Sequence, residues 1–211
     1  MSPQLEAVIG RNITIVYDAL DLQTIDRNKL RNLAVDSQPT IMDTPEMIVA
    51  VYPPNPWFVQ VGDRRIRINL PIETPELGEF PLWEYAIKVN ELLPPEKSVL
   101  IAYGYNFDVS VRFDENTAQE VLNNKFIKDQ AQIEAELCGK LISFMPRLVF
   151  QSEDIRYDII FEPLDDQHMK VHLNSHFESK GLSLPDSDGL KRSYMQQFER
   201  LTSTLMRFLT S

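Results

Sequence analysis

The stretch from Val99 to Phe113 constrains the fold of this chain more than any other segment. Apolar side chains occupy its odd positions, and the even positions carry mostly small or polar side chains such as Gly104, Asn106 and Asp108. Because successive side chains of a β-strand point to opposite faces of a sheet, this alternation predicts one long strand with one buried and one solvated face. Gly104 is a position at which a strand of this length can bulge or bend.

Two further segments have the pattern of β-hairpins. In the first, Trp57–Val61 and Arg64–Leu70 flank Gly62-Asp63, and a glycine at the first central position is typical of a type II′ turn. In the second, the alternating runs 155–161 and 169–173 are joined by a short polar turn that contains proline. Hairpins pair their strands antiparallel, so the sequence predicts a mostly antiparallel sheet.

Helical spacing of apolar residues marks the remaining segments. Apolar side chains recur every three to four positions, which predicts helices over about 82–93, 115–126, 130–145 and 188–209. We therefore expect an α+β fold with a mostly antiparallel sheet of about five or six strands, helices packed on one face and a long C-terminal helix. No internal repeat or linker stands out, so residues 1–211 are expected to form a single domain with a flexible tail over 1–11.

The overall charge and the cysteine content limit the setting in which the protein works. The chain carries a formal net charge of −10 at pH 7, which disfavours binding to nucleic acid and to anionic membranes. It has one cysteine, Cys138, and therefore no internal disulfide and no cysteine-based zinc site. No signal peptide or membrane-spanning apolar run is apparent, so we expect a soluble, cytoplasmic protein.

The common catalytic signatures are missing. The seven glycines lie far apart in the sequence, so the chain contains no G-x-G-x-x-G, no P-loop and no G-x-S-x-G motif. Cys138 lies in a predicted amphipathic helix with no histidine nearby in sequence, and we interpret it as a packing or inert surface residue. No cofactor is predicted.

All three histidines fall within one short run, at His168, His172 and His176. On a helix this spacing of four would allow the side chains to share a metal ion, but the alternation of the neighbouring apolar residues favours a strand. Residues four apart on a strand are separated by roughly 13 Å, too far to bind one ion. The three histidines are therefore weak metal candidates, whereas His172 and His176, together with Asn174, are candidates for a site on the solvated face.

Two other features suggest binding. Arg64, Arg65 and Arg67 form the densest basic cluster, and Arg65 and Arg67 share one face of their strand, where a small anion or an acidic partner could dock. The segment Tyr52–Phe58 is rich in proline and aromatic residues. Its Trp57 is a weak candidate for contact with a partner, because such a segment is more often a rigid connection with the indole in the core.

These observations support three hypotheses for the function. The first is a non-enzymatic protein-interaction protein, such as an adaptor, an assembly factor or a chaperone-like accessory, which binds another protein or a second copy of itself. In its general layout of antiparallel strands, helices on one side and acidic charge, the chain resembles SecB-type chaperone domains. The second is an enzyme of unrecognised type that uses the strand 168–176, and the third is a binding module for a small anion centred on Arg65 and Arg67.

Overall fold

The computed structural model describes residues 3–54, 57–71, 77, 79–93, 98–178 and 183–210. The strands are β1 (Gln4–Tyr17), β2 (Thr40–Asp43), β3 (Met47–Tyr52), β4 (Trp57–Gly62), β5 (Arg65–Leu70), β6 (Leu100–Arg112), β7 (Arg147–Ser152), β8 (Ile155–Pro163) and β9 (His168–Glu178). The helices are α1 (Arg27–Arg31), α2 (Leu82–Asn90), α3 (Ala118–Phe126), α4 (Gln130–Leu137) and α5 (Ser187–Thr210), with a short 3₁₀ helix at Leu22–Thr24.

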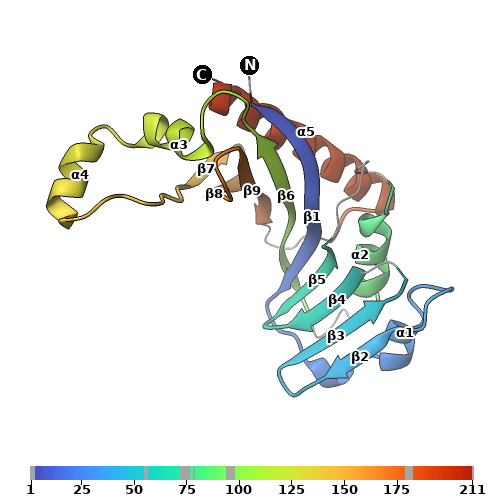
Figure 1. Cartoon of the computed structure of the whole chain (residues 1–211). Helices are drawn as coiled ribbons and strands as arrows, with labels where there is room; N and C mark the ends of the chain where they lie inside the picture. Colours follow the sequence, from blue (N-terminus) through green and yellow to red (C-terminus); the bar gives the residue numbers. More distant parts are fainter. Residues whose placement is uncertain are drawn as a thin grey trace.

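The α+β class and the long C-terminal helix are confirmed, but the sheet is larger than predicted. In the described part of the chain the strands form one nine-stranded antiparallel sheet in the order β2-β3-β4-β5-β1-β6-β9-β8-β7 (Figure 1), not five or six strands. Two of the additional strands, β2 and β7, lie at the two edges of the sheet. β2 is short and mostly exposed, so it has none of the alternation by which strands are predicted.

The N-terminal segment also differs from the expectation. β1 begins at Gln4, so most of the segment 1–11 that we expected to be a flexible tail belongs to a strand. This part of β1 pairs with the far half of β6, from Gln4 opposite Arg112 to Gly10 opposite Asp108, with register shifts between them. The irregular pairing explains why no clean alternation marks it in the sequence.

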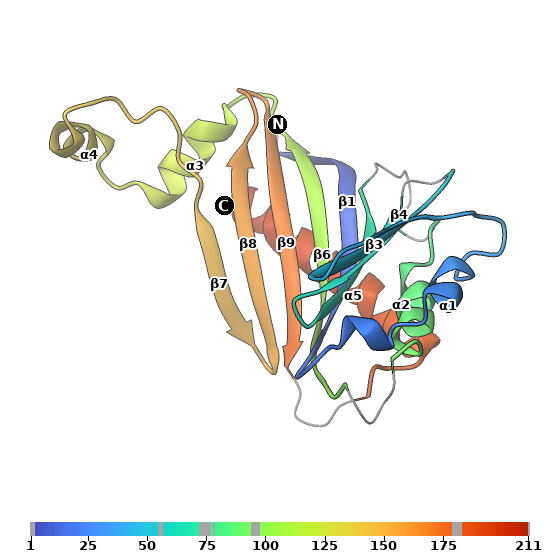
Figure 2. The same ribbon diagram turned by 90° about the horizontal axis from the view of Figure 1, so that it is seen from below.

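One face of the sheet is covered and the other is open. Alternate residues of the central strands are buried, and they form a continuous apolar core with the helices. The long helix α5 lies against β1 and β6, and α2 lies against β1 and β5 and also contacts α5 (Figure 2). The other face of the same strands carries polar and charged side chains, as the alternation predicts.

The order of elements repeats along the chain, which the sequence did not suggest. Each half consists of a long strand, one or two helices, an antiparallel run of strands (β2–β5 in the first half, β7–β9 in the second) and a further helix, so that β2 has no counterpart in the second half. The strand order is mirrored about the β1–β6 pair, because β5 lies beside β1 as β9 lies beside β6. The two halves are therefore related by an approximate two-fold axis that passes between β1 and β6, perpendicular to the sheet.

Two local predictions need correction. The first hairpin is confirmed, but its turn residues are Asp63 and Arg64, both with positive φ, and not Gly62-Asp63. The helix predicted over 130–145 ends at Leu137, and Cys138 follows in the left-handed conformation. The stripe that suggested a longer helix continues instead into an irregular segment and β7.

Residues 128–145, which include α4, form an arm that projects away from the sheet (Figures 1 and 2). None of these residues is buried. Leu137, Ile142 and Met145 expose 66%, 89% and 62% of their surface. In the described part of the chain, the arm included, no helix is long and apolar enough to cross a membrane.

Candidate functional site

The open face of the sheet contains a hollow of about 490 Å³, which we call the open-face hollow. Its walls and floor come from six neighbouring strands, β5, β1, β6, β9, β8 and β7. The residues that line it are Asn12, Thr14, Val16, Arg65, Arg67, Gly104, Asn106, Arg147, Arg156, Asp158, Ile160, His172, Asn174 and His176. The hollow thus spans the β1–β6 pair, where the two halves of the chain meet, and extends further on the side of β9, β8 and β7.

The floor is a hydrogen-bonded row of amides. Asn12 is paired with Asn106 across β1 and β6, and Asn106 is paired with Asn174 across β6 and β9. Nδ2 of Asn174 donates to Oδ1 of Asn106 at 2.6 Å, and Nδ2 of Asn106 donates to Oδ1 of Asn12 at 2.8 Å. The hydroxyl of Thr14 also donates to Oδ1 of Asn12, at 3.0 Å. These bonds hold the floor in one arrangement without adding charge to it.

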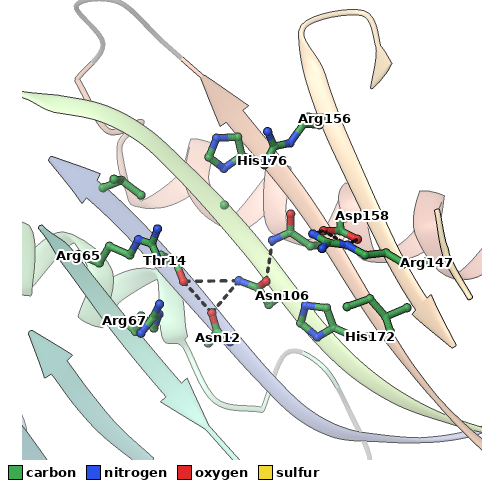
Figure 3. Close-up of a pocket in the computed structure, with 14 residues that line it drawn as sticks. Asn12, Thr14, Arg65, Arg67, Asn106, Arg147, Arg156, Asp158, His172 and His176 are labelled. Carbon is green, nitrogen blue, oxygen red and sulfur yellow. Dashed lines mark hydrogen bonds and ion pairs between the residues drawn. The ribbon is translucent and has the colours of Figure 1, made fainter. Parts of the chain in front are cut away.

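Arginines stand on both sides of this floor (Figure 3). Arg65 and Arg67 project from β5 on one side, and Arg147 and Arg156 project from β7 and β8 on the other. Gly104 lies between the two groups of arginines, and because it has no side chain, no side-chain atom fills the centre of the hollow at this position.

The hollow is positively charged although the chain as a whole is acidic. Four arginines and one aspartate line it, which gives a formal charge of +3 with the histidines neutral. Arg147 binds Asp158 through its guanidinium group, and this contact raises the pKa of Arg147. Among the described residues, Arg67 and Arg156 form no ion pair. Burial, and then the nearby charge of Arg65, lower the pKa of Arg67.

Two of the three histidines face the hollow. Nδ1 of His172 lies 2.8 Å from Oδ1 of Asp108, so the carboxylate orients the imidazole. His176 is half-buried, and its pKa is lowered by burial and by Arg156, against a weaker opposing effect of Glu178. Chemically, this side of the hollow can bind an anion and hold a proton, whereas its lining includes no serine or cysteine nucleophile.

The structure brings together residues that the sequence singled out for separate reasons. Arg65 and Arg67 from the first hairpin lie across the floor from His172 and His176 on β9, and all four line one hollow. The histidine-bearing segment is a strand, as its alternation predicts. Within the described residues, no group of three or more histidine, cysteine, aspartate or glutamate side chains is placed to hold a metal ion.

Three other candidates lie elsewhere. His168 stands at the start of β9, where its Nδ1 is 2.9 Å from Oδ1 of Asp165, and it does not line the hollow. Trp57 is 3% exposed and stacks on Tyr52 with ring centroids 4.0 Å apart, so the structure places it in the core. Cys138 is exposed on the arm.

Sequence reasoning named Asn174 of the floor but missed its other members, Asn12, Thr14 and Asn106, and the second pair of arginines. A signal for the floor does exist, because Gly10-Arg11-Asn12 in β1 corresponds to Gly104-Tyr105-Asn106 in β6. A second short match, Arg67-Ile68-Asn69 and His172-Leu173-Asn174, lies in the strands that flank them. Arg147 and Arg156 carry no such signal, since they reach the hollow only through the pairing of β7, β8 and β9.

Comparison with known proteins adds no further assignment to this geometry. No model of a protein family matches the sequence, and no curated protein matches it with significant similarity.

Proposed function

We propose that this chain is a binding protein that takes up an anionic ligand in the open-face hollow. One observation carries the proposal: a chain with a formal net charge of −10 gathers four arginines around a single hollow. Like charges brought together in this way repel one another, so their placement costs stability unless a counter-charge is bound. An anion in the hollow supplies that counter-charge.

The chemistry of the lining suits a phosphate or carboxylate group. Arginine offers a planar fork of N–H donors that matches both groups, and Arg67 and Arg156 are not engaged by a carboxylate of the described chain. The amide and hydroxyl groups of Asn12 and Thr14 add neutral hydrogen-bonding capacity beside them. The lining contains no phenylalanine, tyrosine or tryptophan ring on which a nucleobase could stack, which favours a compact anion over a nucleic acid.

Calorimetric titration with inorganic phosphate at low ionic strength tests this proposal. We expect saturable binding to the wild-type chain and a loss of about tenfold or more in the variant R65A/R67A, because each charge-assisted hydrogen bond contributes about 1.5–3 kcal/mol. The matched control is R192A/R207A, which removes the same charge from exposed positions on α5 outside the hollow. Binding should also weaken as salt is added.

Two results would count against the proposal. One is the absence of saturable phosphate binding to the wild-type chain. The other is an equal loss in R65A/R67A and in R192A/R207A, which would show that only the net charge of the chain matters.

The projecting arm favours a second candidate function, the docking of another protein. The exposed side chains of Leu137, Ile142 and Met145 lie on an arm whose Phe144, unlike these three residues, packs against the core. Large exposed apolar side chains on a projecting segment are typical of protein-binding surfaces. For either function we propose a cytoplasmic location, which a chain with one cysteine supports.

A further inference from the structure

The cationic side chains of the open-face hollow fall into two groups. Arg65 and Arg67 stand on β5 at one end, and Arg156 and Arg147 stand at the other end beside His172 and His176. Between the two groups lie only neutral side chains, those of Asn12, Thr14 and Asn106, and Gly104. A single small anion at the centre would be out of reach of most of these cations.

We propose that the natural ligand is a two-headed anion, with a phosphate or carboxylate group at each end and an uncharged, hydrogen-bonding middle. The inference rests on the proposed function and specifies its ligand. One head binds Arg65 and Arg67, the other binds Arg156 together with His176, and the middle lies over Thr14 and Gly104 beside the amide row.

The register of the sheet supports this division. Asn69, Asn12, Asn106 and Asn174 lie opposite one another in a single row across β5, β1, β6 and β9. In the neighbouring row, Arg67, Thr14, Gly104, His176 and Arg156 lie opposite one another across β5, β1, β6, β9 and β8. The register therefore places Arg67 at one end of this row and His176 with Arg156 at the other.

The length of the ligand follows from the strand spacing. Three steps between neighbouring strands separate β5 from β9, which is roughly 14 Å at about 4.8 Å a step. Arginine and histidine side chains reach inward from both ends, so the two anionic groups must lie closer together than that. A chain or ring of about six carbon atoms between the two heads has a suitable length.

The floor is suited to a polar middle and not to an apolar one. In the described structure Nδ2 of Asn12 and Oδ1 of Asn174 have no hydrogen-bond partner in the protein, which leaves a donor and an acceptor at the two ends of the amide row. Hydroxyl groups between the heads can bond to both. An aliphatic middle would cover these groups without satisfying them, which is unfavourable.

Matched pairs of probes test the inference by titration calorimetry. Fructose 1,6-bisphosphate and fructose 6-phosphate differ by one head, as do glucarate and gluconate, and all four carry hydroxyl groups in the middle. We expect the two-headed member of at least one pair to bind about tenfold or more tightly than its one-headed partner, because the second contact forms within the same complex. In R65A/R67A and in R156A this advantage should be lost, while binding of the one-headed probe persists at the intact end.

The inference fails if both members of each pair bind the wild-type chain equally well, or if the advantage survives in R65A/R67A and R156A. In those cases the proposed function would still hold if inorganic phosphate binds to the wild-type chain and if this binding depends on Arg65 and Arg67. If no probe and no inorganic phosphate binds, the proposed function fails along with the inference.

Discussion

Gly104 allows β6 and β9 to lie close together at the centre of the hollow. A Cβ atom at this position would lie 2.8 Å from the backbone oxygen of Ser175, closer than non-bonded atoms can approach. The sequence suggested Gly104 as a bulge or bend in a long strand, and the contact with Ser175 gives a specific reason for the glycine. At the scale of the residue, the site thus depends on a missing side chain as well as on charged ones.

His176 makes the stability of the chain sensitive to mild acid. Its pKa is lowered in the folded chain by burial and by Arg156, so the unfolded chain, in which histidine titrates at about 6.5, binds the proton first as the pH falls. The contribution of neutral His176 is therefore fully present above about pH 7 and is lost as the pH falls through the folded pKa. We expect H176Q to lose less stability than the wild type between pH 7 and pH 5 in urea unfolding curves.

An H176Q variant with the same pH profile as the wild type would contradict the prediction.

Among the elements, the strands were easier to predict than the arm. The period of two predicted β6 and β9 because each has one face in the core and one in solvent. β7 was missed because Leu148 continues the spacing of Ile133, Leu137 and Leu141, although the helix stops at Leu137. A helical stripe predicts a buried face only where another element packs against it, and nothing in the sequence shows that α4 lies away from the sheet.

The arm can be changed without cost to the fold. Because Leu137, Ile142 and Met145 are exposed, we expect the triple variant L137A/I142A/M145A to change the free energy of unfolding by no more than about 0.5 kcal/mol. By contrast, L122A removes a fully buried side chain of α3 and should cost about 2–5 kcal/mol. Chemical denaturation of both variants measures these two changes in the free energy of unfolding.

The same triple variant tests the docking of a partner through the arm. A protein recovered in near-equal amount with the tagged wild-type chain should be absent when the triple variant is used. Equal recovery with both chains would place the partner elsewhere, and a large loss of stability in the triple variant would show that the arm packs on the body in solution.

At the scale of the whole molecule, the site results from pairing between the two halves. Arg65, Arg67, His172 and His176 could each be identified in the sequence, but as members of separate hypotheses. Their assembly depends on the pairing of β1 with β6, between residues about 90 positions or more apart in the chain, which local periodicity does not reveal. The short sequence matches, residues 10–12 with 104–106 and residues 67–69 with 172–174, can be connected with this pairing only once the register is known.

The shared centre predicts that the two halves unfold together. β1 and β6 form the longest pairing in the sheet, and Trp83 on α2 lies 5.9 Å from the ring of Tyr194 on α5. Both tryptophans belong to the first half, whereas the longest helix belongs to the second. Tryptophan fluorescence and far-ultraviolet circular dichroism should therefore give superimposable denaturation curves. A fluorescence midpoint clearly separate from the dichroism midpoint would show that the halves are independent.

The approximate two-fold axis has a consequence for the orientation of anything bound across it. Two identical subunits would present identical ends, and a ligand could bind either way round. In a single chain each end can diverge independently, and here Arg67 on one side corresponds to His172 on the other, while Asp158 lines the hollow on the side of β8 alone. The open face therefore has a direction, and a molecule with unlike ends has one preferred way to lie on it.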